Sequence, residues 1–371
     1  MFHIFSTQAY NIYELNKGVD VNVSVLEYFP GANTPEGFFS YYDDILKSHE
    51  AQRIIVLKGG PGTGKSTFMK KIAKHINSLG YDTELLHCSS DPNSLDGVCS
   101  REKGFLILDG TSPHIVDPKC PGAVDEIINL GECWDKEKIK KHKKEIIETG
   151  EQISSYFARA YRYMSVAKSL QMQIWYGDVG NDSMKQIKYE LEKIKRNVTV
   201  RAGTKIGNER RAFLSAITPL GRMNYINTFC ENSDIVYKIK SNCQKTAGLF
   251  MNGLAQMLRE KGEDIRTFYC PMSPDKKIEH IYANGILFTL ENDYHKSDRS
   301  IESHIIELGN QTNREYDLFS DIEQYNLLLD GAEKMMKCAK ELHDKLEEYY
   351  IPYMDFGRVE KLCNKVIEDI N

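Results

Sequence analysis

The sequence predicts an α/β protein made of two tandem parallel-sheet cores, each followed by a helical hairpin at its C-terminal end. Three observations lead to this prediction. Apolar runs of strand length alternate with helical segments, a glycine-rich turn joins one strand to one helix, and the second half of the chain repeats the first. Alternation of this kind is typical of parallel sheets that carry helices on both faces.

The glycine-rich turn lies at residues 59–66. Its sequence, GGPGTGKS, matches the pattern G-x-x-x-x-G-K-[ST] of the Walker A motif, or P-loop. The apolar run 53–58 before it predicts a buried strand, and residues 67–73 after it predict a helix. Four glycines let the backbone curl so that successive N–H groups point at a phosphate chain. A chance glycine-rich loop is the alternative, and this strand–loop–helix setting argues against it.

The motif predicts a site for ATP and Mg²⁺. Lys65 is expected to reach the β and γ phosphates, and Ser66 is expected to hold the metal. The residues expected to contact ATP are Gly59, Gly60, Pro61, Gly62, Thr63, Gly64, Lys65, Ser66 and Thr67.

An internal repeat divides the chain. Five blocks recur in the same order, at residues 32–41 and 216–225, 80–88 and 262–270, 92 and 274, 104–114 and 285–295, and 127–131 and 305–309. This order predicts a duplicated core. The expected organisation is an N-terminal extension over residues 1–24, a first core with the intact motif over 25–198, and a second, degenerate core over 199–371.

The two copies differ in the residues that would bind nucleotide. The second copy has no glycine between residues 240 and 247, so positive φ angles are unfavourable there. In the aligned blocks Lys65 falls on Ala247, and Asp109 falls on Leu290. The second copy is therefore expected not to bind nucleotide. The alternative is weak binding through Lys245 and Glu291.

Two acids and a histidine accompany the motif. Asp109 ends the apolar run 105–109, where a carboxylate is suited to Mg²⁺ at the C-terminal edge of a sheet. Asp91 follows the strand at 83–88, where it would orient water, take a proton from an acceptor hydroxyl, or cap a turn. His114 is a weaker candidate, because a histidine recurs at the aligned position of the second copy. Lys65, Asp91 and Asp109 are the expected catalytic residues, and Ser66 and Asp109 the expected metal ligands.

Composition indicates the expected cellular compartment of the protein and the classes of partner that are not expected. The net charge of −5 gives no indication of nucleic acid or of an anionic membrane as a partner. No apolar run approaches the roughly 20 residues needed to cross a bilayer, and the N-terminus lacks the pattern of a secretory signal. The nine cysteines form no C-x-x-C pair, as expected for reduced thiols in a cytoplasmic protein. A zinc site at Cys120, Cys133 and His114 is disfavoured by their spacing.

A basic, glycine-containing segment at 193–211 lies between the copies. A linker is the favoured interpretation, and a lid over phosphates or an oligonucleotide contact is the alternative. Arg210, Arg211 and Arg222 are candidates for an arginine finger that the second copy would lend to the first, or for ordinary surface salt bridges.

Long stretches of the chain resemble a family of tandem P-loop ATP-binding proteins from Gram-positive, often spore-forming or anaerobic, bacteria. The stretches are GGPGTGKSTFMKKI, LLHCSSDPNSLDGV, ILDGTSPHIVDPKCPGAVDEIINLGE and RAYRYMSVAK. The resemblance covers nearly the whole chain after residue 26 and implies two P-loop folds and ATP binding, but no particular substrate. Family members can keep a complete second motif, from which this chain departs.

Two shorter stretches, GGPGTGK and GFLILDG, are similar to adenylate and related nucleotide kinases.

The expected function is Mg²⁺-dependent ATP hydrolysis in the first half, with the second half as a regulatory copy or platform. The alternatives are a nucleotide or small-molecule kinase and a nucleotide-dependent scaffold. A second substrate or protein partner is expected, but the sequence does not identify it.

Overall fold

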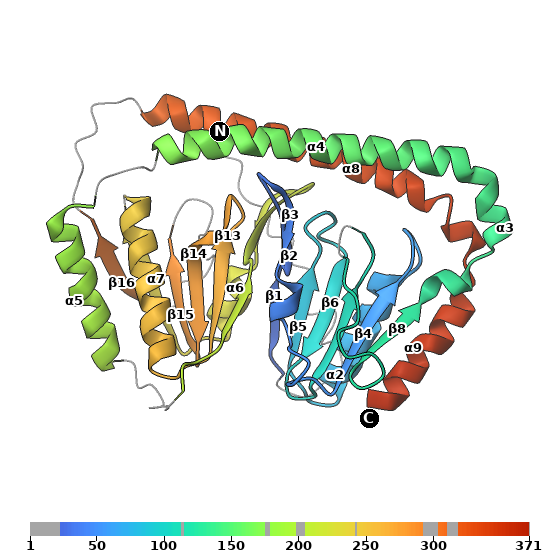
Figure 1. The fold of residues 1–371 in the computed structure, drawn as a ribbon, viewed down its shortest axis with the longest axis horizontal. Coiled ribbons are helices and arrows are strands. Elements are labelled where there is room, and N and C mark those ends of the chain that lie inside the picture. The colour runs from blue at the N-terminus through green and yellow to red at the C-terminus, as the bar shows by residue number, and fades with distance from the viewer. Residues whose placement is uncertain are drawn as a thin grey trace.

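The computed structural model describes residues 23–112, 115–174, 179–197, 205–241, 243–291, 303–309 and 318–370. Two six-stranded sheets stand side by side, and two long helices, α4 and α8, run across both of them (Figure 1). The architecture is α/β, as the sequence predicts. No helix in these ranges is both long enough and apolar enough to cross a membrane.

The elements of the first half are β1 Val25–Tyr28, β2 Gly31–Thr34, β3 Gly37–Ser40, η1 Tyr42–Asp44, β4 Arg53–Lys58, α2 Lys65–Ser78, β5 Thr83–His87, β6 Leu95–Ser100, β7 Phe105–Asp109, β8 Asp125–Asn129, η2 Leu130–Cys133, α3 Lys136–Ile139, η3 Lys140–His142, α4 Lys143–Ile174 and α5 Asn181–Asn197.

The elements of the second half are β9 Glu209–Ala212, β10 Ser215–Thr218, β11 Gly221–Asn224, α6 Ile226–Glu231, β12 Ile235–Ser241, α7 Gln244–Glu260, β13 Ile265–Cys270, β14 Ser273–Ala283, β15 Ile286–Leu290, β16 Ser303–Leu308, α8 Leu318–Glu347, η4 Ile351–Tyr353 and α9 Phe356–Ile370.

The first sheet has the order β1-β5-β6-β7-β4-β8. Strand β6 is antiparallel to both of its neighbours, and the other pairs are parallel. The sheet is therefore mixed and mostly parallel, whereas the sequence predicts a parallel sheet. The chain reverses after β5 and again after β6, where Gly104 adopts a φ of 58° in the turn to β7. Two reversals insert one antiparallel strand and leave the others parallel.

The second sheet has the order β16-β12-β15-β14-β13-β9. Reading this order from the other end places β9, β13, β14, β15, β12 and β16 at the positions of β1, β5, β6, β7, β4 and β8. Strand β14 is again antiparallel to both neighbours. The two halves of the chain therefore share one strand order and one pattern of strand directions.

The repeated Thr-Pro-x-Gly sequence forms the turn of a β-hairpin in each half. The hydroxyl of Thr34 donates to the carbonyl of Gly37 at 2.7 Å, and that of Thr218 donates to Gly221 at 2.7 Å. Both glycines have a positive φ, 114° and 106°, which only glycine adopts readily. The sequence of residues 38–47 predicts a short helix, but the segment contains β3 and the short 3₁₀ helix η1 instead.

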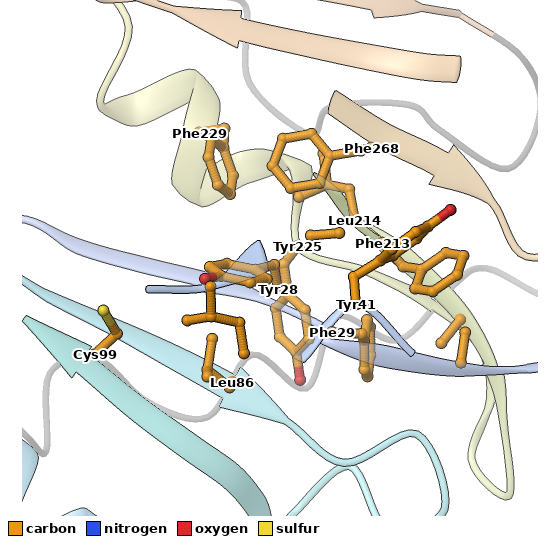
Figure 2. Close-up of a cluster of buried hydrophobic side chains, with 14 of the residues drawn as sticks. Tyr28, Phe29, Tyr41, Leu86, Cys99, Phe213, Leu214, Tyr225, Phe229 and Phe268 are labelled. Atoms are coloured by element: carbon orange, nitrogen blue, oxygen red, sulfur yellow. The ribbon is translucent and has the colours of Figure 1, made fainter. Parts of the chain in front are cut away.

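A central apolar cluster joins the halves (Figure 2). Phe29 and Phe213 exchange backbone hydrogen bonds of 2.9 and 3.0 Å across the junction. Each of these rings packs against a tyrosine from the other half, Phe29 against Tyr225 at 5.0 Å and Phe213 against Tyr41 at 5.1 Å. The contacts on the two sides of the junction are therefore near copies of each other, as in a symmetric dimer interface.

One buried charge network breaks this symmetry. Glu84 on β5 accepts hydrogen bonds from the Tyr28 hydroxyl at 2.6 Å and from Arg101 at 2.7 Å. Arg266 on β13, at the position that corresponds to Glu84 in the other sheet, donates to the same carboxylate at 2.5 Å. Burial raises the pKa of Glu84, but the charges of Arg266 and Arg101 and the hydrogen bonds outweigh it and hold the pKa at about 2.

Helices α4 and α8 pair with each other and not with their neighbours in sequence (Figure 1). Their shared core contains Ala160, Met164 and Ala167 from α4 and Leu329, Ala332 and Met336 from α8. The prediction of a helical hairpin within each half is therefore wrong. Each of the two long helices has an apolar stripe, and packing α4 against α8 buries both stripes.

The helices that follow are exchanged between the halves. Helix α5 packs on α7 of the second sheet, with Ile187 and Ile194 buried in that core. Helix α9 packs on α2 of the first sheet, where Val359 and Cys363 are buried beside Phe68. The predicted boundary at 198/199 thus separates α5 from the sheet that it covers.

Candidate functional site

The Walker A residues form a loop between β4 and α2. Gly62 and Gly64 have φ angles of 67° and 86°, and Gly64 is the N-cap of the helix. A Cβ atom on Gly62 would lie 2.7 Å from Ile351 Cγ1, and one on Gly59 would lie 2.8 Å from Thr63 Oγ1. The conformation therefore requires glycine both for its backbone angles and for its close contacts.

The backbone N–H groups of this loop are available to a ligand. The N–H groups of Gly62, Gly64, Lys65 and Ser66 donate no hydrogen bond to the described residues. These donors open the fourteen-residue helix α2, whose N-terminus carries a partial positive charge. The first four N–H groups of a helix have no acceptor within the helix, so a ligand or water must bond to them. An anionic chain of phosphate size fits this requirement.

Lys65 lies across the mouth of the loop. Its Nζ donates to the carbonyl oxygens of Gly59 at 3.0 Å and Gly60 at 2.9 Å. The same ammonium is 3.6 Å from Asp109 Oδ2, and the side chains of Lys65 and Asp109 are only 12% and 14% exposed. The structure thus brings together the predicted phosphate cation and the predicted metal acid.

Asp109 is held at the end of β7, directly beside the loop. Strand β7 pairs with β4 so that Asp109 faces Leu57. The Thr111 N–H donates to Asp109 Oδ1 at 2.8 Å, and the Thr111 hydroxyl donates to the Gly59 carbonyl at 2.9 Å. The first bond leaves Asp109 Oδ2 directed towards the lysine, and the second joins Thr111 to the glycine loop.

Ser66 is positioned by the antiparallel strand β6. Its Oγ accepts a hydrogen bond from the Leu95 N–H at 3.1 Å, which leaves oxygen lone-pair capacity for a metal. Hard oxygen ligands from one hydroxyl and one carboxylate suit Mg²⁺, which keeps several waters when it binds with nucleotide. The described residues contain no group of three or more His, Cys, Asp or Glu arranged around a common point. His114 of the disfavoured zinc site lies outside the described residues.

Asp91 lies in the segment between β5 and β6. Its carboxylate accepts from the Ser94 hydroxyl at 2.9 Å, and its carbonyl accepts from the Ser94 N–H at 2.8 Å. Lys70 of α2 donates to the Asn93 carbonyl at 2.7 Å, which fixes the segment beside the helix. Asp91 therefore closes a local turn and also lies on the side of the site where Ser66 is held.

The outer wall of the loop comes from a distant part of the chain. Cβ atoms built on Gly60 would meet Trp134 at 3.2 Å and Tyr350 at 3.3 Å, and one on Gly62 would meet Glu347 at 3.3 Å. Glu347 is the last residue of α8, and Tyr350 follows the helix. The second half thus supports the loop of the first.

The corresponding connection in the second half has a different form. Strand β12 ends at Ser241 and α7 begins at Gln244, with Cys243 as its N-cap in an extended conformation. Thr246 and Ala247, which align with Gly64 and Lys65, are buried inside the helix. This connection holds no described residue with a positive φ. Residues 59–66, the cradle, align with residues 241–248, which include the end of β12 and the first turn of α7.

The three candidate finger arginines each have acidic partners elsewhere. Arg210 pairs with Glu50 at 2.8 Å, and Arg211 pairs with Asp44 at 2.5 Å. Arg222 donates to Glu333 at 2.7 Å and to Asn326 at 3.0 Å. His114, and residues 198–204 of the basic segment, lie outside the described residues.

A cation that the sequence analysis missed does reach the site. Lys340 of α8 places its Nζ 3.6 Å from Asp91 Oδ2. Nothing in the local sequence of α8 marks this lysine, because it is one of several charged residues on a long helix. Only the pairing of α8 with α4 brings it to the first sheet.

Neither a family model, nor a curated protein, nor a solved structure matches this chain.

Proposed function

We propose that the first half of the chain binds ATP with Mg²⁺ and hydrolyses it. One observation carries the proposal: a glycine loop with unpaired N–H groups opens a long helix, and Lys65 and Asp109 meet 3.6 Å apart at its mouth. The N–H groups of residues 62–66 would bind phosphate oxygens. Lys65 would add a charge-assisted contact, which is roughly twice as strong as a neutral hydrogen bond.

The remaining residues support hydrolysis. Ser66 and Asp109 would hold Mg²⁺, which neutralises charge on the phosphates when it is bound. Asp91 would orient a water molecule and accept its proton as the water oxygen bonds to the terminal phosphorus. The bond from that phosphorus to the bridging oxygen breaks, and ADP and inorganic phosphate leave. The hydrogen-bonded turn at Ser94 would keep Asp91 in place.

We also infer that the two halves descend from one duplicated core that was of the P-loop type. The shared strand order and the paired Thr-Pro-x-Gly turns support this origin. The resemblance to tandem P-loop ATP-binding proteins and a cytoplasmic location belong to the same proposal. In it, the second half is a platform that does not bind nucleotide.

The deciding experiment is ATP consumption by the purified full chain, with and without acceptors. Steady release of phosphate with Mg²⁺ and no acceptor supports hydrolysis. ADP that forms only with an added nucleoside, nucleoside monophosphate or metabolite indicates a kinase instead. Saturable ATP binding with no ADP under either condition indicates a nucleotide-dependent scaffold. Absence of ATP binding would overturn the proposal.

A further inference from the structure

Helix α8 crosses the candidate site from one side to the other. At one end Glu347 lies against Gly62, at the tip of the glycine loop. Further back along the helix Lys340 reaches Asp91. These two positions are seven residues apart, which places them on the same helix face about two turns, or roughly 10 Å, from each other. One face of α8 therefore spans the distance between the loop and Asp91.

Lys340 is held in place by acidic groups. Its Nζ forms ion pairs with Asp91 and with Asp344, and its side chain is 25% exposed. Burial lowers the pKa of Lys340, but the hydrogen bond to Asp344 and the charges of Asp91, Asp344 and Glu347 outweigh it and raise the pKa above its usual value. The ammonium is therefore charged at neutral pH and remains so beside a bound anion.

The positions of the charged side chains around the site favour a role for Lys340 at the far end of the phosphate chain. Asp91 and Asp109 both bring negative charge to the edge of the sheet where phosphates are expected. At the tip of the loop, Glu347 is near His343, with 3.7 Å between Nδ1 and Oε1. Lys65 donates to the carbonyl oxygens of the loop, whereas Lys340 contacts Asp91.

We propose that Lys340, contributed by the second half, binds the terminal phosphate of ATP in exchange for its contact with Asp91. This inference rests on the proposed function and deepens it. The exchange places a cation on the group that is transferred and releases the Asp91 carboxylate to act on water. It also assigns to the second half a direct part in turnover, which the three candidate arginines do not supply.

The test compares ATP with ADP, because ADP lacks the terminal phosphate. Binding of both nucleotides, and the rate of phosphate release, are measured for the full-length wild type and for Lys340→Ala. The expected result is that ATP affinity falls at least about tenfold while ADP affinity stays within about twofold, since a charge-assisted contact is lost for ATP alone. Turnover at saturating ATP falls as well. Lys337→Ala, which removes an exposed lysine from the same helix, should change neither affinity.

Two further variants separate contact from folding. Lys340→Arg keeps the charge and should restore most of the preference for ATP over ADP, whereas Lys340→Gln should not. Equal losses for ATP and ADP in Lys340→Ala, or no loss for either, would overturn the inference while leaving ATP binding through the loop intact. If the wild type binds neither nucleotide, the proposed function itself fails, and this inference fails with it.

Discussion

The two strand-to-helix connections of this protein have equivalent positions and different structures. Between β4 and α2, the chain forms a glycine loop with two positive φ angles, at Gly62 and Gly64. Between β12 and α7, the helix starts earlier, and Thr246 and Ala247 are buried within its first turns. The strands on either side keep their order in both sheets.

This difference shows which part of the structure depends on the motif. The sheet and the helix behind it are stabilised by buried apolar residues on both sides, such as Ile55 and Leu57 in one half and Ile239 and Phe288 in the other. The loop adds little to that core. The framework therefore persists without the cradle, while the cradle requires glycines at particular positions. Four predictions follow from this contrast, ordered by the size of the expected effect.

The largest effect is expected where the halves carry opposite charges at equivalent positions. Glu84→Gln leaves Arg101 and Arg266 without their carboxylate and should lower the free energy of unfolding by about 3–5 kcal/mol at pH 7. The pKa of Glu84 is lowered to about 2 in the folded protein. The contribution of the Glu84 carboxylate to the free energy of unfolding is therefore complete at pH values above the ordinary pKa of a glutamate. It declines as the pH falls towards 2. Urea unfolding of both proteins at pH 7 and pH 4 should show the difference between them shrinking at the lower pH.

Glu36→Gln serves as the matched control, because Glu36 pairs with Lys168 at the surface and is 58% exposed. A surface ion pair of this kind contributes about 0–1 kcal/mol. Equal destabilisation by both variants would show that the network at Glu84 is not special to the junction.

The next largest effect concerns the cradle itself. Lys65→Ala should weaken ATP binding by roughly 1.5–3 kcal/mol, because it removes a charged donor from the phosphate chain. Calorimetric titration with ATP measures the loss. Lys74→Ala, an exposed lysine on the same helix, is the control and should bind like the wild type. Unchanged affinity in Lys65→Ala would mean that the loop is not the nucleotide site.

A smaller and more selective effect is expected at Asp109. Asp109→Asn should reduce Mg²⁺-dependent phosphate release by roughly tenfold, because in the proposed site the carboxylate would act through the ion and not on the base or sugar. Nucleotide binding measured in a chelator should change much less. Wild-type rates at limiting Mg²⁺ would show that Asp109 only ends the strand.

The smallest effect is expected in the second half. Lys245→Ala should shift ATP affinity and stability by less than about 0.5 kcal/mol, since the α7 connection has no cradle. The same titration should give one ATP per chain for the wild type. Two equivalent sites, or a loss in Lys245→Ala equal to that in Lys65→Ala, would make the two connections functionally alike.

Sequence reasoning located the loop and its neighbouring elements well. The predicted strands at 53–58 and 105–109 coincide with β4 and β7, and the approach of Lys65 to Asp109 is as expected from strands that pair side by side. Each of these features depends on residues that are close in sequence or on adjacent parallel strands. Local patterns contain that information.

The features that the sequence did not predict depend on tertiary contacts. Strand β6 was not predicted, and its direction follows from two turns rather than from its own residues. The pairing of α4 with α8 is selected by complementary apolar faces far apart in the chain. The contact of Lys340 with Asp91 depends on that pairing, so no local pattern could reveal it.

The exchange of α5 and α9 has a consequence for biosynthesis. Domains generally fold in order as they leave the ribosome, but the first sheet here is covered in part by α9, which emerges after every other element described. Until then the face of α2 that holds Phe68 lacks the partner that Val359 and Cys363 supply. The support of the glycine loop by Ile351 arrives equally late. A nascent chain that ends before η4 therefore carries the glycine loop without the contacts that Ile351, Val359 and Cys363 supply to it and to α2.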